Sequence, residues 1–160
     1  AVLLHMYGHA LIKFVLFYIA CTIIQEYQTR NMMRIHGMMG DVPHTATFWL
    51  AGMLGILGLP PMGLFFSKFY ILTDMFRQGH WVAGGLLILL LTGVLIGILY
   101  HGMRMLCDIP KRKPLGDLLG KIDVPVLAAL LLLTCIVGAG FERITWINKL
   151  LDNAVKVIGG

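Results

Sequence analysis

Long apolar segments separated by short polar connections make up most of the chain. Five segments are expected to be helices, with approximate limits at Val2–Ile24, Ala46–Leu59, Pro61–Gln78, Trp81–Leu106 and Val124–Phe141. A helix that crosses the hydrocarbon core of a bilayer, roughly 30 Å thick, needs about 20 apolar residues. The apolar residues form long runs and do not alternate with polar ones, as they would in a half-buried strand. The pattern predicts an all-α integral membrane protein with about five transmembrane helices.

One of these helices is expected to be interrupted, because the stretch "GLPP" lies between the second and third segments. Two consecutive prolines end one helix and can open the next. Lys68 follows this stretch and lies about 10 Å along the third segment. Broken helices at membrane depth leave backbone groups unpaired, which is tolerated where they line a wet cavity. Lys68 is therefore a candidate for a charge that gates or switches ion movement.

The end of the chain has a different pattern, with apolar residues at helical spacing and polar residues on the opposite face. The apolar positions are Trp146, Ile147, Leu150, Leu151, Ala154, Val155 and Ile158. This pattern predicts a C-terminal amphipathic helix at the membrane interface or against a partner, and a solvated helical end is the alternative. We therefore expect a transmembrane bundle over residues 1–141 and a tail helix over residues 142–160.

The composition agrees with a membrane protein, since 58% of the residues are hydrophobic and only 13% are charged. The formal net charge of +5 would suggest a nucleic-acid partner in a soluble protein. Here it fits the bias of Lys and Arg toward cytoplasmic loops, and we expect no nucleic acid. Cys21, Cys107 and Cys135 form no CxxC or Cys/His spacing. We therefore expect no metal site and no cofactor held by this chain.

The first segment carries three ionisable residues on one face, because His5, His9 and Lys13 are each four residues apart. A lysine near the centre of a transmembrane helix costs about 2.5–3.5 kcal/mol on insertion scales, and such residues often mark ion paths. Histidine exchanges protons near neutral pH. The three residues are therefore candidates for a proton path. In the structural alternative, the histidines form interhelical hydrogen bonds and Lys13 snorkels, although Lys13 lies near the middle of its run.

The structural alternative for Lys68 is neutralisation by a nearby acid. Asp74 follows it on a different face of the helix, and Arg77 is the better placed partner for Asp74. Asp74 and His101 are secondary site candidates. His101 shares a face with Arg104 near the end of the fourth segment, where the two residues are expected to mark the membrane interface.

Three stretches carry a resemblance to a known family: "HMYGHALIKFVLFYIAC", "QTRNMMRIHGM" and "LGILGLPPMGLFFSKFYIL". They resemble the antiporter-like proton-translocating subunits of respiratory complex I, Mrp-type cation/proton antiporters and group-four membrane-bound NiFe hydrogenases. In that family an H-xxx-H-xxx-K row lies on the tenth of about fourteen helices, and it matches His5, His9 and Lys13. A lysine or glutamate after the "LPP" turn of the interrupted twelfth helix ends the proton path, and it matches Lys68. The loop "YQTRNMMRIHG" looks closest to the hydrogenase branch.

The resemblance implies that the chain is the C-terminal part of such a subunit. Its function would be proton translocation within a redox-driven complex such as a membrane-bound hydrogenase or an NADH dehydrogenase-like complex. The alternatives are a subunit of a Mrp-type Na⁺/H⁺ antiporter and a structural membrane subunit without its own proton path. The chain would hold no redox site, so NiFe, iron–sulfur or flavin centres are expected in partner subunits. Other membrane subunits and lipid are the expected partners, and the cell inner membrane is the expected location.

Overall fold

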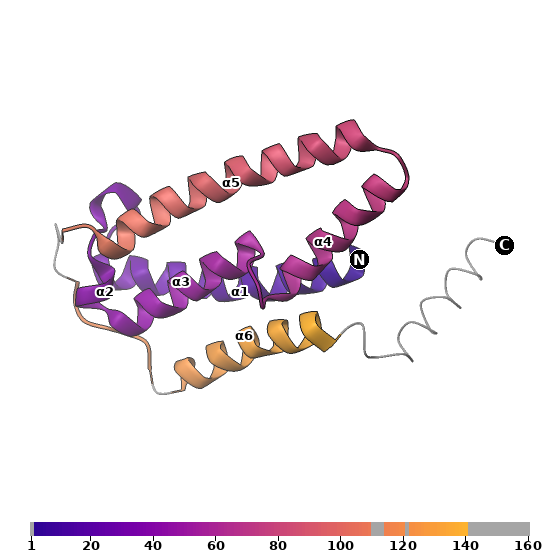
Figure 1. The fold of residues 1–160 in the computed structure, drawn as a ribbon. Helices are drawn as coiled ribbons and strands as arrows, with labels where there is room; N and C mark the ends of the chain where they lie inside the picture. Colours follow the sequence, from indigo (N-terminus) through magenta and orange to yellow (C-terminus); the bar gives the residue numbers. More distant parts are fainter. Residues whose placement is uncertain (1, 110–113, 121, 141–160) are drawn as a thin grey trace.

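The computed structural model describes residues 2–109, 114–120 and 122–140. Over these residues the protein is built from helices and contains no strand (Figure 1). The elements are α1 (Val2–Tyr27), the 3₁₀ turn η1 (Met32–Arg34), α2 (Met38–Asp41), α3 (Pro43–Leu57), α4 (Gly63–Arg77), α5 (Trp81–Cys107) and α6 (Asp123–Gly140). The predicted tail helix over residues 142–160 lies outside the described residues.

Two of the helices, α1 with 26 residues and α5 with 27, are long and apolar enough to cross a membrane. Each would be about 40 Å long. A stripe of α1 that includes Ile12, Val15 and Ile19 is buried against α3, α4 and α6. Most of the apolar side chains of α5 are exposed, as expected of a helix that faces lipid or further protein. An all-helical bundle is therefore confirmed, whereas the predicted number of about five transmembrane helices is not.

The break predicted at "GLPP" separates α3 from α4, which lie as two halves of one interrupted helix. Each has 15 residues, which is too short to cross a bilayer alone. The two lie roughly end to end in Figure 1, and both contact α1 and α5. Gly58 ends α3 with a φ of +71°, and the N–H of Leu59 donates to the carbonyl of Leu54 at 3.2 Å. This is the usual glycine-terminated end of a helix, and it turns the chain at the predicted position.

The beginning of α4 is held in place by a close approach to α6. A Cβ atom on Gly63 would lie 2.8 Å from the carbonyl oxygen of Thr134, and a Cβ on Gly138 would overlap the backbone of Gly63. Only glycine at both positions allows this backbone contact. The contact fixes the start of α4, and therefore the place of Lys68 one to two turns further along.

At the other end of the bundle, the connection between α1 and α3 folds back against α5. His36 is 1% exposed, and its Nε2 lies 2.8 Å from the carbonyl oxygen of Met33. Its Nδ1 lies 3.0 Å from a carboxylate oxygen of Asp108, which follows α5. Arg104 also approaches this carboxylate, at 3.7 Å. These contacts tie the connection to the last turn of α5.

Candidate functional site: an ionisable cavity at the helix break

Lys68 binds backbone carbonyls at the C-terminal end of α3. Its Nζ donates to the carbonyl oxygens of Leu57 at 3.0 Å and Ile56 at 3.3 Å. The last carbonyls of a helix have no partner within the helix, and they carry the negative end of its dipole. Gly58 leaves room for this contact, because a Cβ there would lie 3.2 Å from both Nζ and Cδ of Lys68. The break in the helix thus creates the binding site of the ammonium group.

No carboxylate of the described residues lies within ion-pair distance of Lys68. Asp74 and Arg77 are both exposed, and no ion pair joins them in the part of the chain that the structure describes. The expected pairing of Asp74 with Arg77 is therefore absent, because both side chains extend into open space. Lys68 is held by backbone carbonyls, and no acid among the described residues forms an ion pair with it.

His5 reaches the same region from α1. Its Nδ1 lies 3.0 Å from the hydroxyl oxygen of Ser67, and that hydroxyl donates to the carbonyl of Leu64 at 3.0 Å. When the only hydrogen of Ser67 goes to Leu64, the Nδ1 of His5 is the donor to Ser67. The neutral imidazole then keeps its other nitrogen, Nε2, as the proton acceptor.

His9 lies one turn after His5, and the two rings are stacked with centroids 5.8 Å apart and an interplanar angle of 17°. The two histidines and Lys68 line one cavity of about 390 Å³ between α1, α3, α4 and α5. Its remaining lining is aliphatic: Ile56, Ile71, Leu87, Leu91, Val94 and Ile98. Three ionisable side chains from two helices therefore share one largely apolar space.

Lys13 does not line this cavity. It follows His9 by one turn on the same stripe of α1, but its side chain is exposed in the described part of the chain. The row predicted from the sequence is thus divided, with two histidines facing Lys68 and Lys13 beyond the cavity.

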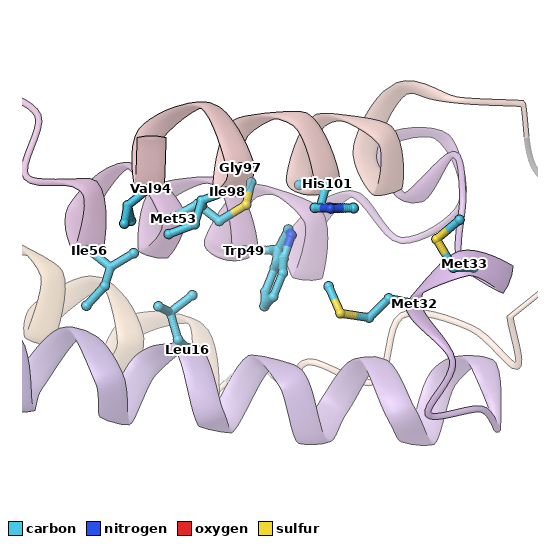
Figure 2. A pocket seen from close by; sticks show the side chains of 11 residues that line it. Leu16, Met32, Met33, Trp49, Met53, Ile56, Val94, Gly97, Ile98 and His101 are labelled. Carbon is cyan, nitrogen blue, oxygen red and sulfur yellow. The ribbon is translucent and has the colours of Figure 1, made fainter. Parts of the chain in front are cut away.

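His101 lines a second, larger cavity of about 780 Å³. Figure 2 shows this cavity between α1, α3 and α5, with the indole nitrogen of Trp49 directed toward the α5 side near His101. Ile56, Val94 and Ile98 line both cavities. These three aliphatic side chains separate His101 from the histidines and Lys68, so the structure does not bring His101 into the candidate site.

Several polar residues that contact one another were not singled out from the sequence. Ser67 is completely buried and is the partner of His5. Glu26, Thr45 and Asp117 form a second polar group at the other end of α1. Among the described residues, no three His, Cys, Asp or Glu side chains form a group that could hold a metal ion.

An interrupted helix whose break faces a cavity with one lysine and two histidines defines the class of protein as a helical membrane bundle with an ionisable internal site. Residues 1–97 match the family described as NADH:quinone oxidoreductase/Mrp antiporter, transmembrane. The chain belongs to this family. The matched residues include His5, His9 and Lys68.

Individual relatives come from several branches of the family. An NADH-quinone oxidoreductase protein from Desulforudis audaxviator, its subunit N, is 37% identical over 94 residues, which cover 58% of this chain and 19% of the relative. A hydrogenase-4 component F homolog from Methylacidiphilum infernorum is 34% identical over 58% of this chain and 19% of the relative. One of the Na⁺/H⁺ antiporter subunits from Bacillus subtilis is 36% identical over 51% of this chain and 10% of the relative.

These identities lie within a narrow range and do not separate the branches, so the assignment to the hydrogenase branch stays a prediction. The aligned part spans less than a fifth of the length of each of these relatives. The fold is also similar to a chain in the solved structure of the Mrp complex from Dietzia sp. DQ12-45-1b, with a TM-score of 0.65. That similarity covers 86% of this chain and 34% of the other chain at 17% identity.

Proposed function

We propose that the chain is part of a subunit that translocates protons across the membrane, in a multi-subunit complex driven by redox chemistry. The proton path would include His5, His9, Lys13 and Lys68. One observation carries the proposal: Lys68 shares a cavity with two histidines at the break of a helix, and no carboxylate of the described residues pairs with it.

The contacts of Lys68 suit a group that gains and loses a proton. An ammonium group has three N–H donors, and two of them bind the carbonyls of Ile56 and Leu57. A neutral amine keeps two N–H donors, so both contacts can persist when the third proton leaves. The proton can therefore exchange without breaking the contacts that position the side chain.

The histidines would exchange protons with Lys68. Ser67 fixes the Nδ1–H of His5, so Nε2 accepts a proton and later releases it. His9, stacked on His5, would extend the path along α1 toward Lys13. The whole row from His5 to Lys13 covers about 12 Å of helix rise. Water in the cavity would complete the hydrogen-bonded links, since no hydrogen bond among the described residues joins His5, His9 and Lys68 to one another.

The setting of the chain follows from the same proposal. Other membrane subunits of a complex I-like assembly would cover the exposed faces of α1 and α5, together with lipid. Any NiFe, iron–sulfur or flavin centres would belong to partner subunits. The location would be the cell inner membrane, with the chain passing through it several times.

Membership of a Mrp-type Na⁺/H⁺ antiporter is the second candidate, because one relative at 36% identity is named for such an antiporter and because the fold resembles a chain of a Mrp complex. The two candidates differ in what drives the proton. In sealed vesicles containing the intact complex, a sodium gradient alone would drive proton movement by the antiporter, whereas the redox-driven subunit would need the electron donor of its complex.

A structural membrane subunit is the third candidate, in which Lys68 only stabilises the end of α3. Lys68→Ala in the intact complex tests the proton path against this reading. We expect proton translocation to be lost while the complex assembles in normal amount, and Arg77→Gln, which changes an exposed charge on the same helix, to translocate normally. Normal translocation by Lys68→Ala would contradict the proposal.

A further inference from the structure

A second group of ionisable residues lies about 31 Å from His5, at the other end of α1. Glu26 is only 1% exposed there, in the last turn of the helix. Its Oε1 lies 2.7 Å from the hydroxyl oxygen of Thr45 and accepts a hydrogen bond from the backbone N–H of Leu118 at 2.9 Å. Its Oε2 is buried and has no hydrogen-bond partner among the described residues.

Asp117 approaches the same hydroxyl from the connection that precedes α6. Its Oδ1 lies 3.1 Å from the hydroxyl oxygen of Thr45, and its Oδ2 accepts from the backbone N–H and the Nδ1 of His44, both at 2.9 Å. Burial raises the pKa of Asp117, but the hydrogen bonds from His44, Thr45 and the N–H of Leu119 outweigh burial and hold it below its usual range. Asp117 is therefore the ionised member of the pair.

The single hydroxyl hydrogen of Thr45 cannot form hydrogen bonds with Glu26 and Asp117 at once if both carboxylates are ionised. Thr45 has one hydroxyl hydrogen, yet its oxygen lies within hydrogen-bond distance of both Glu26 and Asp117. If both acids were ionised, one of these short contacts would join two lone pairs. A proton on Glu26 resolves the conflict, because Glu26 then donates to Thr45 and Thr45 donates to Asp117.

The surroundings also favour a neutral Glu26. Among the residues that the structure describes, the other ionisable side chains of this group are Tyr27, Asp41 and His44, of which none is permanently positive. No Lys or Arg of the described residues forms an ion pair with Glu26 or Asp117. An ionised carboxylate that is buried without a cation is strongly unfavourable, and such a group becomes neutral instead.

We propose that Glu26, Thr45 and Asp117 form a proton-binding site that holds one exchangeable proton. The proton resides on Glu26, and the hydrogen-bonded chain through Thr45 and Asp117 connects it to His44, whose side chain is 65% exposed. When the proton leaves, two adjacent carboxylates repel one another. The segment over residues 114–120 then separates from α1, where Leu115 and Leu118 donate to the backbone and side chain of Glu26.

This site is independent of the proton path through Lys68, and its test does not measure translocation. Infrared spectroscopy of the full-length protein in its membrane complex can detect the C=O band of a protonated carboxyl. Ordinary Asp and Glu side chains, with pKa values of about 4, are ionised at neutral pH and give no such band. We expect a protonated-carboxyl band at pH 7 that is absent from Glu26→Gln and present in Asp74→Asn, which changes an exposed acid.

A second variant tests whether the two acids share the site. In Asp117→Asn the neighbouring negative charge is gone, so the band of Glu26 should disappear at a lower pH than in the unchanged protein. Equal amounts of assembled complex on a native gel show that each variant has folded. The proposal is overturned if the unchanged protein lacks the band at pH 7, if Glu26→Gln retains it, or if Asp117→Asn leaves its titration unchanged.

Discussion

The two ends of α3 bind opposite charges. At its beginning, the backbone N–H of His44 donates to the carboxylate of Asp117, and at its end the carbonyls of Ile56 and Leu57 accept from Lys68. Both arrangements follow the helix dipole, which favours an anion at the first turn and a cation at the last. Each end of this helix of 15 residues thus contributes to holding one ionisable group.

The two ends differ in what surrounds the charge. Lys68 faces a cavity of about 390 Å³ with two histidines, so its proton has a place to go. Asp117 lies within a dense group of hydrogen bonds that fastens a loop to α1 and α3. We propose that the end of α3 beside the cavity serves proton transfer, whereas the end held by many hydrogen bonds couples protonation to the position of a loop.

The largest change should come from closing the space at the end of α3. Gly58→Ala places a Cβ at a φ of +71° and 3.2 Å from the Nζ of Lys68. The left-handed conformation costs a non-glycine residue about 1–2 kcal/mol, and Lys68 is also displaced from its carbonyls. We expect lower thermal stability and loss of proton translocation. Gly79→Ala, at a φ of +79° where the new Cβ meets no atom within 4 Å, is the matched control and should lower thermal stability while leaving proton translocation unchanged.

Removing the hydroxyl that Glu26 and Asp117 share, which belongs to Thr45, should lower the stability of the contacts at the beginning of α3. Thr45→Val keeps the shape of the buried side chain but leaves Glu26 and Asp117 without this partner. We expect the free energy of unfolding to fall by about 1–3 kcal/mol, as is usual when buried polar groups lose a partner. Thr47→Val removes an exposed hydroxyl from the same helix and should change stability little. Equal stability of the two variants in chemical denaturation would show that the shared hydroxyl does not hold the loop.

The smallest expected effect is that of low pH on the loop over residues 114–120. The folded state lowers the pKa of Asp117. Ionised Asp117 therefore stabilises the loop fully at pH values above about 3.9, the pKa of an Asp in an unfolded chain. This stabilisation is lost as the pH falls through the lower pKa of the folded state. Pepsin cleavage within residues 114–120 can report the loss. Cleavage should be slower than in Asp117→Asn at pH 4 and should approach the rate of that variant at lower pH. A constant ratio of the two rates across this range would refute the assigned role of Asp117.

The limits of the long helices were predictable from the sequence to within a few residues, since runs of apolar residues fix them. The first helix extends to Tyr27 and not only to Ile24, because Glu26 is buried there by Thr45 and Leu118. In the sequence, polar residues after an apolar run indicate the start of a loop, so the prediction ended this helix too early. The sequence marks the break at "GLPP", but it does not show that α3 and α4 lie end to end.

The part of the site that depends on the spacing of residues along the chain was predictable. His5 and His9 share a helix face, and Lys68 follows the break, so their meeting required only the packing of α1 against α4. Ser67 was missed because a serine within a helix usually bonds its own preceding turn, as it also does here. The partners of His36 and His44 were out of reach, since Asp108 and Asp117 lie far along the chain and no local pattern links them.

The most direct measurement of the central claim replaces Lys68 by a cation that keeps its charge at physiological pH. Lys68→Arg retains charge and reach, but a guanidinium does not deprotonate in proteins. We predict that sealed vesicles with the assembled Lys68→Arg complex show strongly reduced acidification when the complex is driven, and that Lys68→Glu, which can exchange a proton, recovers part of it. Full acidification by Lys68→Arg would show that Lys68 acts only as a fixed charge at the end of α3.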